Sequence, residues 1–200
     1  YVLGNKEGYS PGPAAIRGTR IHNSIEDFHN GKGCLDEEIP VKMAEYLSTY
    51  YDKEGWTAYP EFEFALTKEW EATTFDADDA YVRGYIDNLF VFDYGGTKRV
   101  VIDEYKTGQE YDEHAQQKAM YAMVGMVLYP DIDSIEVVGV YLDKKKLKPT
   151  TYNRAHLHSM QYTWQRDIAK LDIPIFPARP GIHCRWCPKS NKKGGPCKVG

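Results

Sequence analysis

The chain has 200 residues, 42% hydrophobic and 27% charged, which is typical of one globular domain with a sizeable core and a small appendage. No apolar run approaches the ~20 residues of a membrane-spanning helix, and the N-terminal residues lack the pattern of a secretory signal. We therefore expect a cytoplasmic protein without a membrane partner. The formal net charge of −4 argues against a protein that coats DNA through its overall charge. It is compatible with an enzyme whose acidic site is neutralised by metal ions.

Two amphipathic helices are predicted in the first quarter of the chain, over residues 13–30 and 36–51, after an irregular lead-in. In each helix, apolar side chains recur at the spacing of one helical face. These side chains are Ile21, Ile25 and Phe28 in the first helix, and Ile39, Met43 and Leu47 in the second.

An antiparallel meander of strands is predicted next. Residues 61–66 alternate between polar and apolar side chains with the period of a strand. Strands over residues 81–92 and 99–105 follow, and a turn at residues 93–96 folds one strand against the other.

The second half of the chain predicts a crossover between parallel strands. A helix over residues 112–128 precedes a strand over 134–142, which makes a β-α-β unit. A basic turn, a short strand and a last helix are predicted over residues 144–146, 150–152 and 155–171. The predicted fold class is α/β, with a central mixed sheet flanked by helices. We expect residues 1–172 to form the core and residues 173–200 to form a small Cys-rich tail packed on it.

The cysteines indicate a metal-binding tail rather than disulfides. Cys184 and Cys187 are separated by two residues, and Cys197 follows ten residues later. Close spacing of this kind is typical of a zinc or iron–sulfur site. The fourth cysteine, Cys34, is distant in the sequence.

The strand over residues 99–105 carries two acids and is followed by a lysine. Because successive side chains of a strand point to opposite faces, Glu104 and Lys106 share one face, and Asp103 and Tyr105 share the other. A carboxylate on that face can bind a hard cation, and a neighbouring ammonium can orient water. A surface ion pair is the alternative interpretation.

Asp87 is a second acid among apolar neighbours in the preceding strand. An unpaired carboxylate there is costly unless it is protonated, hydrogen-bonded or bound to a cation. The turn at residues 93–96 can bring Asp87 close to Glu104, and a divalent metal would resolve the repulsion between them. An internal salt bridge is the alternative.

These residues resemble the PD-(D/E)XK nuclease superfamily, and specifically its RecB-like exonuclease branch. Asp87 and the segment Glu104-Tyr105-Lys106 match its two central motifs. Gly18-x-x-x-His22 on the first helix and Gln117-x-x-x-Tyr121 on the later helix match two further motifs of that branch. The four motifs occur in the family's order over residues 18–121. The resemblance implies a restriction-endonuclease-like core.

The resemblance also implies a role for each matching residue. His22, Asp87, Glu104 and the carbonyl of Tyr105 would hold one or two Mg²⁺ or Mn²⁺ ions, and Lys106 would position the attacking water. Gln117 and Tyr121 would hold a phosphate or Lys106 in place. The alternatives are an exposed hydrogen-bonded histidine for His22 and simple core packing for Tyr121.

Three further acids lie near the predicted site in the sequence. Glu26 shares a helix face with His22 and is expected to orient it or to lie on the surface. Either Glu61 or Glu63 could add a carboxylate to the site, and alternation alone does not choose between them.

The cysteine tail departs from the family's pattern. Some RecB-like nucleases carry a three-cysteine motif near the C-terminus and a fourth cysteine before the helix that bears the histidine. No cysteine precedes His22 in this chain. Either Cys34 completes a [4Fe–4S] cluster, an upstream cysteine is missing from this chain, His183 completes a zinc site, or the tail holds no metal. A metal there would be structural.

Together, these features predict a divalent-metal-dependent deoxyribonuclease, and more specifically an exonuclease of recombination, repair or phage DNA processing. DNA is the expected partner, held by Arg17, Arg20 and the lysines of residues 144–148; for the lysines, a solvated turn is the alternative. The competing functions are an endonuclease of the same fold, a non-catalytic binding module and a cluster-sensing protein built on the cysteines. The sequence does not decide whether the protein forms a homo-oligomer or has a helicase or recombination protein as a partner.

Overall fold

The computed structural model describes residues 11–50, 52–109, 111 and 113–170, with residues 181, 184, 187, 194, 195 and 197 of the tail. The chain divides into two compact units, residues 1–161 and 162–200. The predicted start of the tail at residue 173 lies outside the described residues. Within the described part of the chain, no helix is long and apolar enough to span a bilayer.

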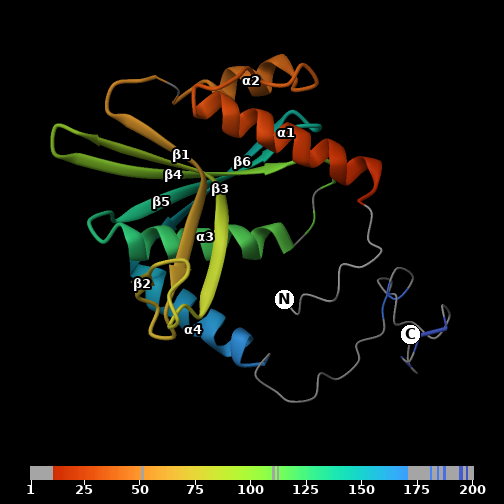
Figure 1. Ribbon diagram of the computed structural model, residues 1–200. Helices are drawn as coiled ribbons and strands as arrows, with labels where there is room; N and C mark the ends of the chain where they lie inside the picture. Colours follow the sequence, from red (N-terminus) through yellow and green to blue (C-terminus); the bar gives the residue numbers. More distant parts are fainter. Residues whose placement is uncertain are drawn as a thin grey trace. The chain divides into compact units, whose positions relative to one another are not determined.

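A single mixed sheet of six strands forms the centre of the first unit, in the order β2-β1-β3-β4-β5-β6 (Figure 1). Strands β4 and β5 run parallel, and every other neighbouring pair is antiparallel. The predicted mixed sheet, with its meander and its crossover, is confirmed. The strands are β1 (Trp56–Leu66), β2 (Ala72–Thr73), β3 (Val82–Tyr94), β4 (Thr97–Lys106), β5 (Ser134–Tyr141) and β6 (Lys146–Asn153).

Helices cover both faces of this sheet. Helices α1 and α2 lie on one face, and α3 lies on the other (Figure 1). The helices are α1 (Pro13–His29), α2 (Val41–Leu47), α3 (Glu113–Leu128) and α4 (Leu157–Ala169), with a short 3₁₀ turn, η1 (Arg154–His156), before α4.

The apolar stripes of α1 and α2 form the core on their face of the sheet. Ile21 and Ile25 of α1 are buried there together with Met43 and Leu47 of α2. They pack on side chains of the central strands, namely Phe90, Val101, Tyr105, Val138 and Val140. Burial of this size fixes α1 against β3 and β4, the strands that carry the predicted acids.

On the opposite face, a glycine lets α3 approach the sheet closely. A Cβ atom at Gly125 would collide with the side chain of Ile135 on β5 and would also contact Ile102 on β4. Because Gly125 has no side chain, α3 lies directly against these strands and is held over the side of β4 that carries Glu104 and Lys106.

The second helix is shorter than predicted. It spans Val41–Leu47 instead of residues 36–51, and residues 36–39 form turns. Pro40 has no N–H to donate to the carbonyl of Asp36, so the helix begins after it. The predicted stripe is nevertheless buried, because Ile39 packs in the same cluster from the turn.

Candidate active site

The site lies where β3 and β4 separate. The tight turn at Gly95 and Gly96, both with positive φ, sets a register in which Asn88 pairs with Asp103. The pairing of the two strands ends there, and the backbone N–H of Tyr105 donates instead to Asp87 Oδ2 at 2.7 Å. The carboxylate of Asp87 therefore replaces a backbone partner at the point of divergence, on the sheet face that also carries Glu104.

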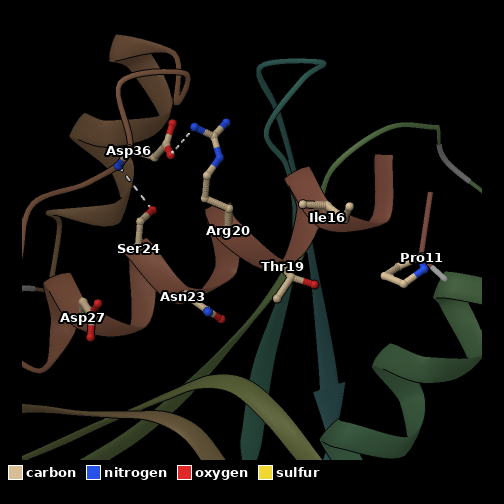
Figure 2. A pocket seen from close by; sticks show the side chains of 8 residues that line it. All are labelled: Pro11, Ile16, Thr19, Arg20, Asn23, Ser24, Asp27 and Asp36. Atoms are coloured by element: carbon tan, nitrogen blue, oxygen red, sulfur yellow. Dashed lines mark hydrogen bonds and ion pairs between the residues drawn. The ribbon is translucent and has the colours of Figure 1, made fainter. Parts of the chain in front are cut away.

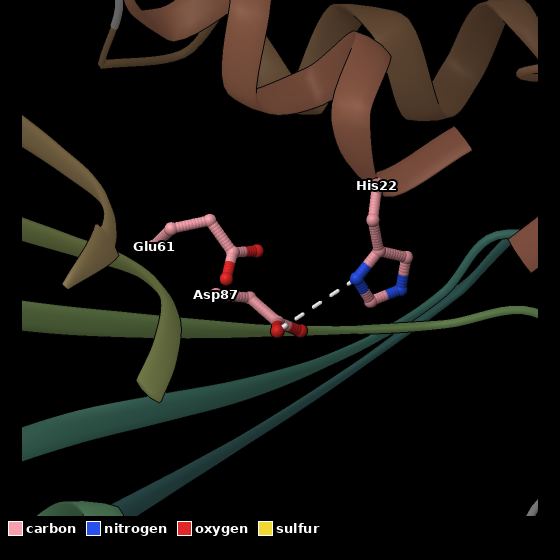
Figure 3. Close-up of side chains that lie close together, drawn as sticks. All are labelled: His22, Glu61 and Asp87. Atoms are coloured by element: carbon pink, nitrogen blue, oxygen red, sulfur yellow. Dashed lines mark ion pairs between the residues drawn. The ribbon is translucent and has the colours of Figure 1, made fainter. Parts of the chain in front are cut away.

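Three side chains converge at this point, from α1, β1 and β3 (Figure 3). His22, Glu61 and Asp87 each present a ligand atom, and these atoms all lie within 4.8 Å of one another. His22 Nδ1 is 3.7 Å from Asp87 Oδ1. The predicted meeting of His22 and Asp87 is thus present, and Glu61 joins them.

The register of the sheet places Glu61 in the site. Pro60 pairs with Asn88 and Phe62 with Ile86, so Glu61 lies opposite Asp87. Glu61 also has a φ of 47°, a left-handed conformation that costs a residue with a Cβ atom about 1–2 kcal/mol. Such strain is characteristic of functional sites, where the surrounding structure holds the residue in place.

A chain of hydrogen bonds joins Glu104 to α3. The ammonium of Lys106 donates to Glu104 Oε1 and, at 3.1 Å, to Gln117 Oε1. The amide nitrogen of Gln117 donates to the Tyr121 hydroxyl at 2.8 Å. The four polar side chains predicted for this part of the site are therefore linked in one network, which fixes the position of the lysine.

Burial and mutual repulsion perturb the two central acids. Burial raises the pKa of Asp87 to about 6, although the N–H of Tyr105 opposes the increase. Burial and the charge of Asp87 raise the pKa of Glu104 to about 7, against the effect of the Lys106 ammonium. Two buried carboxylates of this kind are stabilised in their charged form by a cation between them.

The histidine is in the form that metals bind. Burial lowers the pKa of His22, although the charges of Glu104 and Glu61 oppose the decrease. The ring is therefore neutral at neutral pH and offers a nitrogen lone pair. The backbone of Tyr105 also favours the charged ring, but burial outweighs it.

The residues fit a hard divalent cation. Glu104 Oε2 is buried and receives no hydrogen bond from the described residues, so an acceptor is left for a ligand. Carboxylate oxygens and one imidazole nitrogen suit Mg²⁺ or Mn²⁺. An open pocket of about 390 Å³ gives access to the site, and its lining includes His22, Glu26 and Glu61.

The side chain of Tyr105, unlike its backbone, is not part of this cluster. The side chain of Tyr105 packs in the core on the α1 face, and Asp103, also on that face, accepts a hydrogen bond from the Tyr46 hydroxyl at 2.9 Å. Cys34 is exposed on the loop after α1, and Cys184, Cys187 and Cys197 are partly buried thiols of the second unit. His183 lies outside the described residues.

Both arginines predicted to hold DNA are engaged with acids. Arg17 pairs with Glu38 at 2.7 Å and with Asp143 at 2.9 Å. Arg20 pairs with Asp36 at 3.2 Å and also with Glu38. Lys144 and Lys145 lie in an exposed turn, and Lys146 is the exposed first residue of β6. Of the predicted basic groups described here, these lysines are the more accessible to a phosphate.

Comparison with protein families matches residues 1–191 to the PD-(D/E)XK nuclease superfamily. Comparison with curated proteins finds no match. Among solved structures, the chain is similar to one titled "Crystal structure of SSO0001", with 14% sequence identity and a TM-score of 0.46 over 94% of this chain and 72% of that chain. Because this match covers most of the chain, the chain belongs to the PD-(D/E)XK nuclease superfamily.

Proposed function

We propose that this protein is a divalent-metal-dependent deoxyribonuclease of the RecB-like branch that acts as an exonuclease. The observation that carries the proposal is the convergence of His22, Glu61 and Asp87 within 4.8 Å, beside the paired Glu104 and Lys106. Membership of a nuclease superfamily supports the class of reaction. Recombination, repair or phage DNA processing is the proposed setting.

Each residue of the site has a role in phosphodiester hydrolysis. His22, Glu61, Asp87 and Glu104 would hold Mg²⁺ or Mn²⁺, which when bound polarises a phosphate and lowers the pKa of a nearby water. Lys106 orients the attacking water and offsets the charge that develops on the phosphate.

The α3 residues act on the lysine rather than on the substrate. Gln117 holds the ammonium of Lys106 at 3.1 Å, and Tyr121 is hydrogen-bonded to Gln117 at 2.8 Å. This support keeps the ammonium in one position, which lowers the cost of ordering it during the reaction.

A purely DNA-binding role is less compatible with the site. Glu61, Asp87 and Glu104 place three carboxylates at one point, where they would repel a phosphate. A binding module has no need of such a group, whereas a metal-dependent hydrolase does.

The test compares Lys106→Ala and Glu104→Gln with Lys98→Ala, a lysine of the same strand that pairs with Asp131 at 3.4 Å. We expect the first two variants to lose cleavage by at least about 100-fold while they remain folded. Lys98→Ala is expected to cleave like the unmodified protein, and EDTA to abolish cleavage by all variants. Full activity of both site variants, or activity that persists in excess EDTA, contradicts the proposal.

The exonuclease assignment requires a separate assay. We expect degradation of linear DNA and no cleavage of covalently closed circular DNA of the same sequence. Cleavage of the closed circle would assign the same chemistry to an endonuclease.

A further inference from the structure

A glycine of α1 lies against the loop that follows Lys106, residues 107–109, which we call the lysine loop. A Cβ atom added at Gly18 would come within 3.2 Å of Thr107 Oγ1, a separation tighter than most Cβ contacts in proteins. Thr107 is the residue directly after Lys106, the last residue of β4. Because Gly18 has no side chain, α1 can approach the lysine loop this closely.

Nothing else in the local structure requires a glycine at this position. Gly18 lies in the interior of α1, where glycine is less favourable than alanine because it loses more backbone freedom on folding. Its backbone is helical and its φ is not positive. Among the described residues outside α1, Thr107 Oγ1 is the one atom within 4 Å of the added Cβ. The close contact with Thr107 therefore accounts for the glycine.

Gly18 and His22 lie on the same face of α1. They are four residues apart, which places one above the other on the helix, and both line the open pocket at the candidate active site. The Lys106 ammonium is close enough to His22 to help lower the pKa of its ring. The distance between α1 and the lysine loop at Gly18 therefore governs the distance between His22 and Lys106.

Salt bridges and hydrogen bonds hold α1 in this position. Arg17 pairs with Asp143 at 2.9 Å, and Asp143 also accepts a hydrogen bond from the N–H of Gly108 at 2.9 Å. On the far face of α1, Arg20 pairs with Asp36 at 3.2 Å (Figure 2). Because α1 is held from both sides, an added methyl group strains the helix and the lysine loop or displaces one relative to the other.

We propose that Gly18 is a positioning residue, whose lack of a side chain sets how closely α1 meets the lysine loop and so places His22 relative to Lys106. The inference rests on the proposed nuclease function and deepens it, because it assigns a role to a residue that acts through Thr107. The side chain of Thr107 is branched at Cβ and is therefore stiff. An added Cβ at Gly18 requires a shift of a few tenths of an ångström.

The first part of the test adds the contact. Gly18→Ala is compared with the unmodified protein for kcat and KM on linear DNA, and for Mn²⁺ affinity in a titration without DNA. We expect kcat to fall about fivefold to tenfold at unchanged KM, and Mn²⁺ binding to weaken about threefold, since small displacements are costly in a reacting site. The melting temperature should not fall, because alanine favours a helix more than glycine does.

The second part of the test relieves the contact. Thr107→Ala removes the colliding oxygen, so Gly18→Ala combined with Thr107→Ala should regain the kcat and the Mn²⁺ affinity of Thr107→Ala alone. Thr107→Val puts a methyl group in place of the hydroxyl and should give no rescue. The matched control is Gly12→Ala at the N-cap of α1, where an added Cβ meets none of the described residues within 4 Å. This control should keep both values.

Unchanged kcat and Mn²⁺ affinity in Gly18→Ala, or a loss that Thr107→Ala does not relieve, overturns the inference. A raised KM overturns it as well, because the added Cβ would then obstruct the DNA strand instead of moving α1. These results leave the nuclease assignment intact, since that assignment depends on cleavage by Lys106→Ala and Glu104→Gln. If those two variants retain cleavage, the nuclease proposal fails, and the Mn²⁺ affinities of the single and double variants still decide the role of Gly18.

Discussion

The backbone N–H of Tyr105 donates a 2.7 Å hydrogen bond to Oδ2 of Asp87. This contact joins the two strands at the point where their ladder ends, and it leaves Oδ1 directed toward His22 Nδ1, 3.7 Å away. Asp87 therefore has two separable roles. One oxygen supports the fold, and the other is available to a metal.

The two roles of Asp87 are separated by comparing Asp87→Asn with Asp87→Ala. Asparagine retains an oxygen that can accept from Tyr105 but lacks the charge that a cation needs, so we expect normal stability and loss of cleavage. Alanine also abolishes cleavage and leaves the buried N–H unpaired, which costs about 1–3 kcal/mol. Urea denaturation without metal, together with Mn²⁺ titration, measures both effects. Equal stability of the two variants would show that the hydrogen bond is unimportant to the fold.

The strained backbone of Glu61 leads to a second prediction. Glu61→Gly removes a carboxylate and also accommodates the φ of 47° without strain, whereas Glu61→Gln removes only the charge. We expect both variants to bind Mn²⁺ more weakly than the unmodified protein. The glycine variant should be more stable than the glutamine variant by about 1 kcal/mol, measured as the free energy of unfolding in metal-free buffer. Unchanged Mn²⁺ affinity in both variants would remove Glu61 from the site.

The pairing of the acids follows from local rules, and this is why the sequence predicted it. Alternation along β4 places Glu104 and Lys106 on one face, and a short hairpin turn brings Asp87 alongside. Glu61 could not be chosen over Glu63 in this way, because alternation places both on the same face. Only the pairing of β1 with β3, a contact between distant segments, sets Glu61 opposite Asp87.

The length of the second helix shows a different limit. Its apolar stripe was predicted correctly, since Ile39, Met43 and Leu47 are all buried. The spacing of the stripe does not distinguish a helix from a turn at Ile39, because either conformation can place its side chain in the core. Pro40 was the available signal for the true start.

Asp143 is predicted to position α1 relative to the lysine loop. Its carboxylate accepts from Arg17 on α1, at 2.9 and 3.2 Å, and from the N–H of Gly108, at 2.9 Å. These contacts link the helix that carries His22 to the loop that follows Lys106. Because the pair is partly exposed, we expect Asp143→Ala to lower stability by less than about 1 kcal/mol. The same variant should lower kcat about tenfold or more, since small displacements are costly in a reacting site.

The matched control for Asp143 is Asp131→Ala, which removes an exposed partner of Lys98. It should leave both stability and kcat close to those of the unmodified protein. If the two variants lose the same activity, Asp143 does not act by positioning α1 relative to the loop that follows Lys106. Rescue by Asp143→Glu, with recovery of kcat at unchanged stability, would support positioning.

The tail cysteines are predicted to hold a structural metal. The protein purified without oxygen should contain either stoichiometric zinc or iron with the visible absorbance of an iron–sulfur cluster. Cys187→Ser should lose that metal and lower the melting temperature, because metal binding contributes to folding. Cys34→Ser tests whether the distant cysteine is the fourth ligand. Protein that contains neither metal would show that the predicted centre is wrong.

The stability of the protein is predicted to fall in acid because of His29. This residue of α1 is 9% exposed and lies against the rings of Phe28 and Phe90, and burial lowers its pKa to about 4. In the unfolded chain, His29 has the ordinary histidine pKa of about 6.5. Between about pH 4 and pH 6.5 it is therefore protonated in the unfolded chain and neutral in the folded protein. The contribution of His29 to the free energy of unfolding is therefore complete above about pH 6.5 and is lost as the pH falls toward 4, with a slope of up to about 1.4 kcal/mol per pH unit.

Urea denaturation of His29→Gln across this range should show a correspondingly smaller acid slope, whereas His156→Gln, at an exposed histidine, should keep the original one. Since the buried carboxylates titrate in all three proteins, their effects cancel in the comparison, and equal slopes would mean that His29 accepts its proton in the folded state.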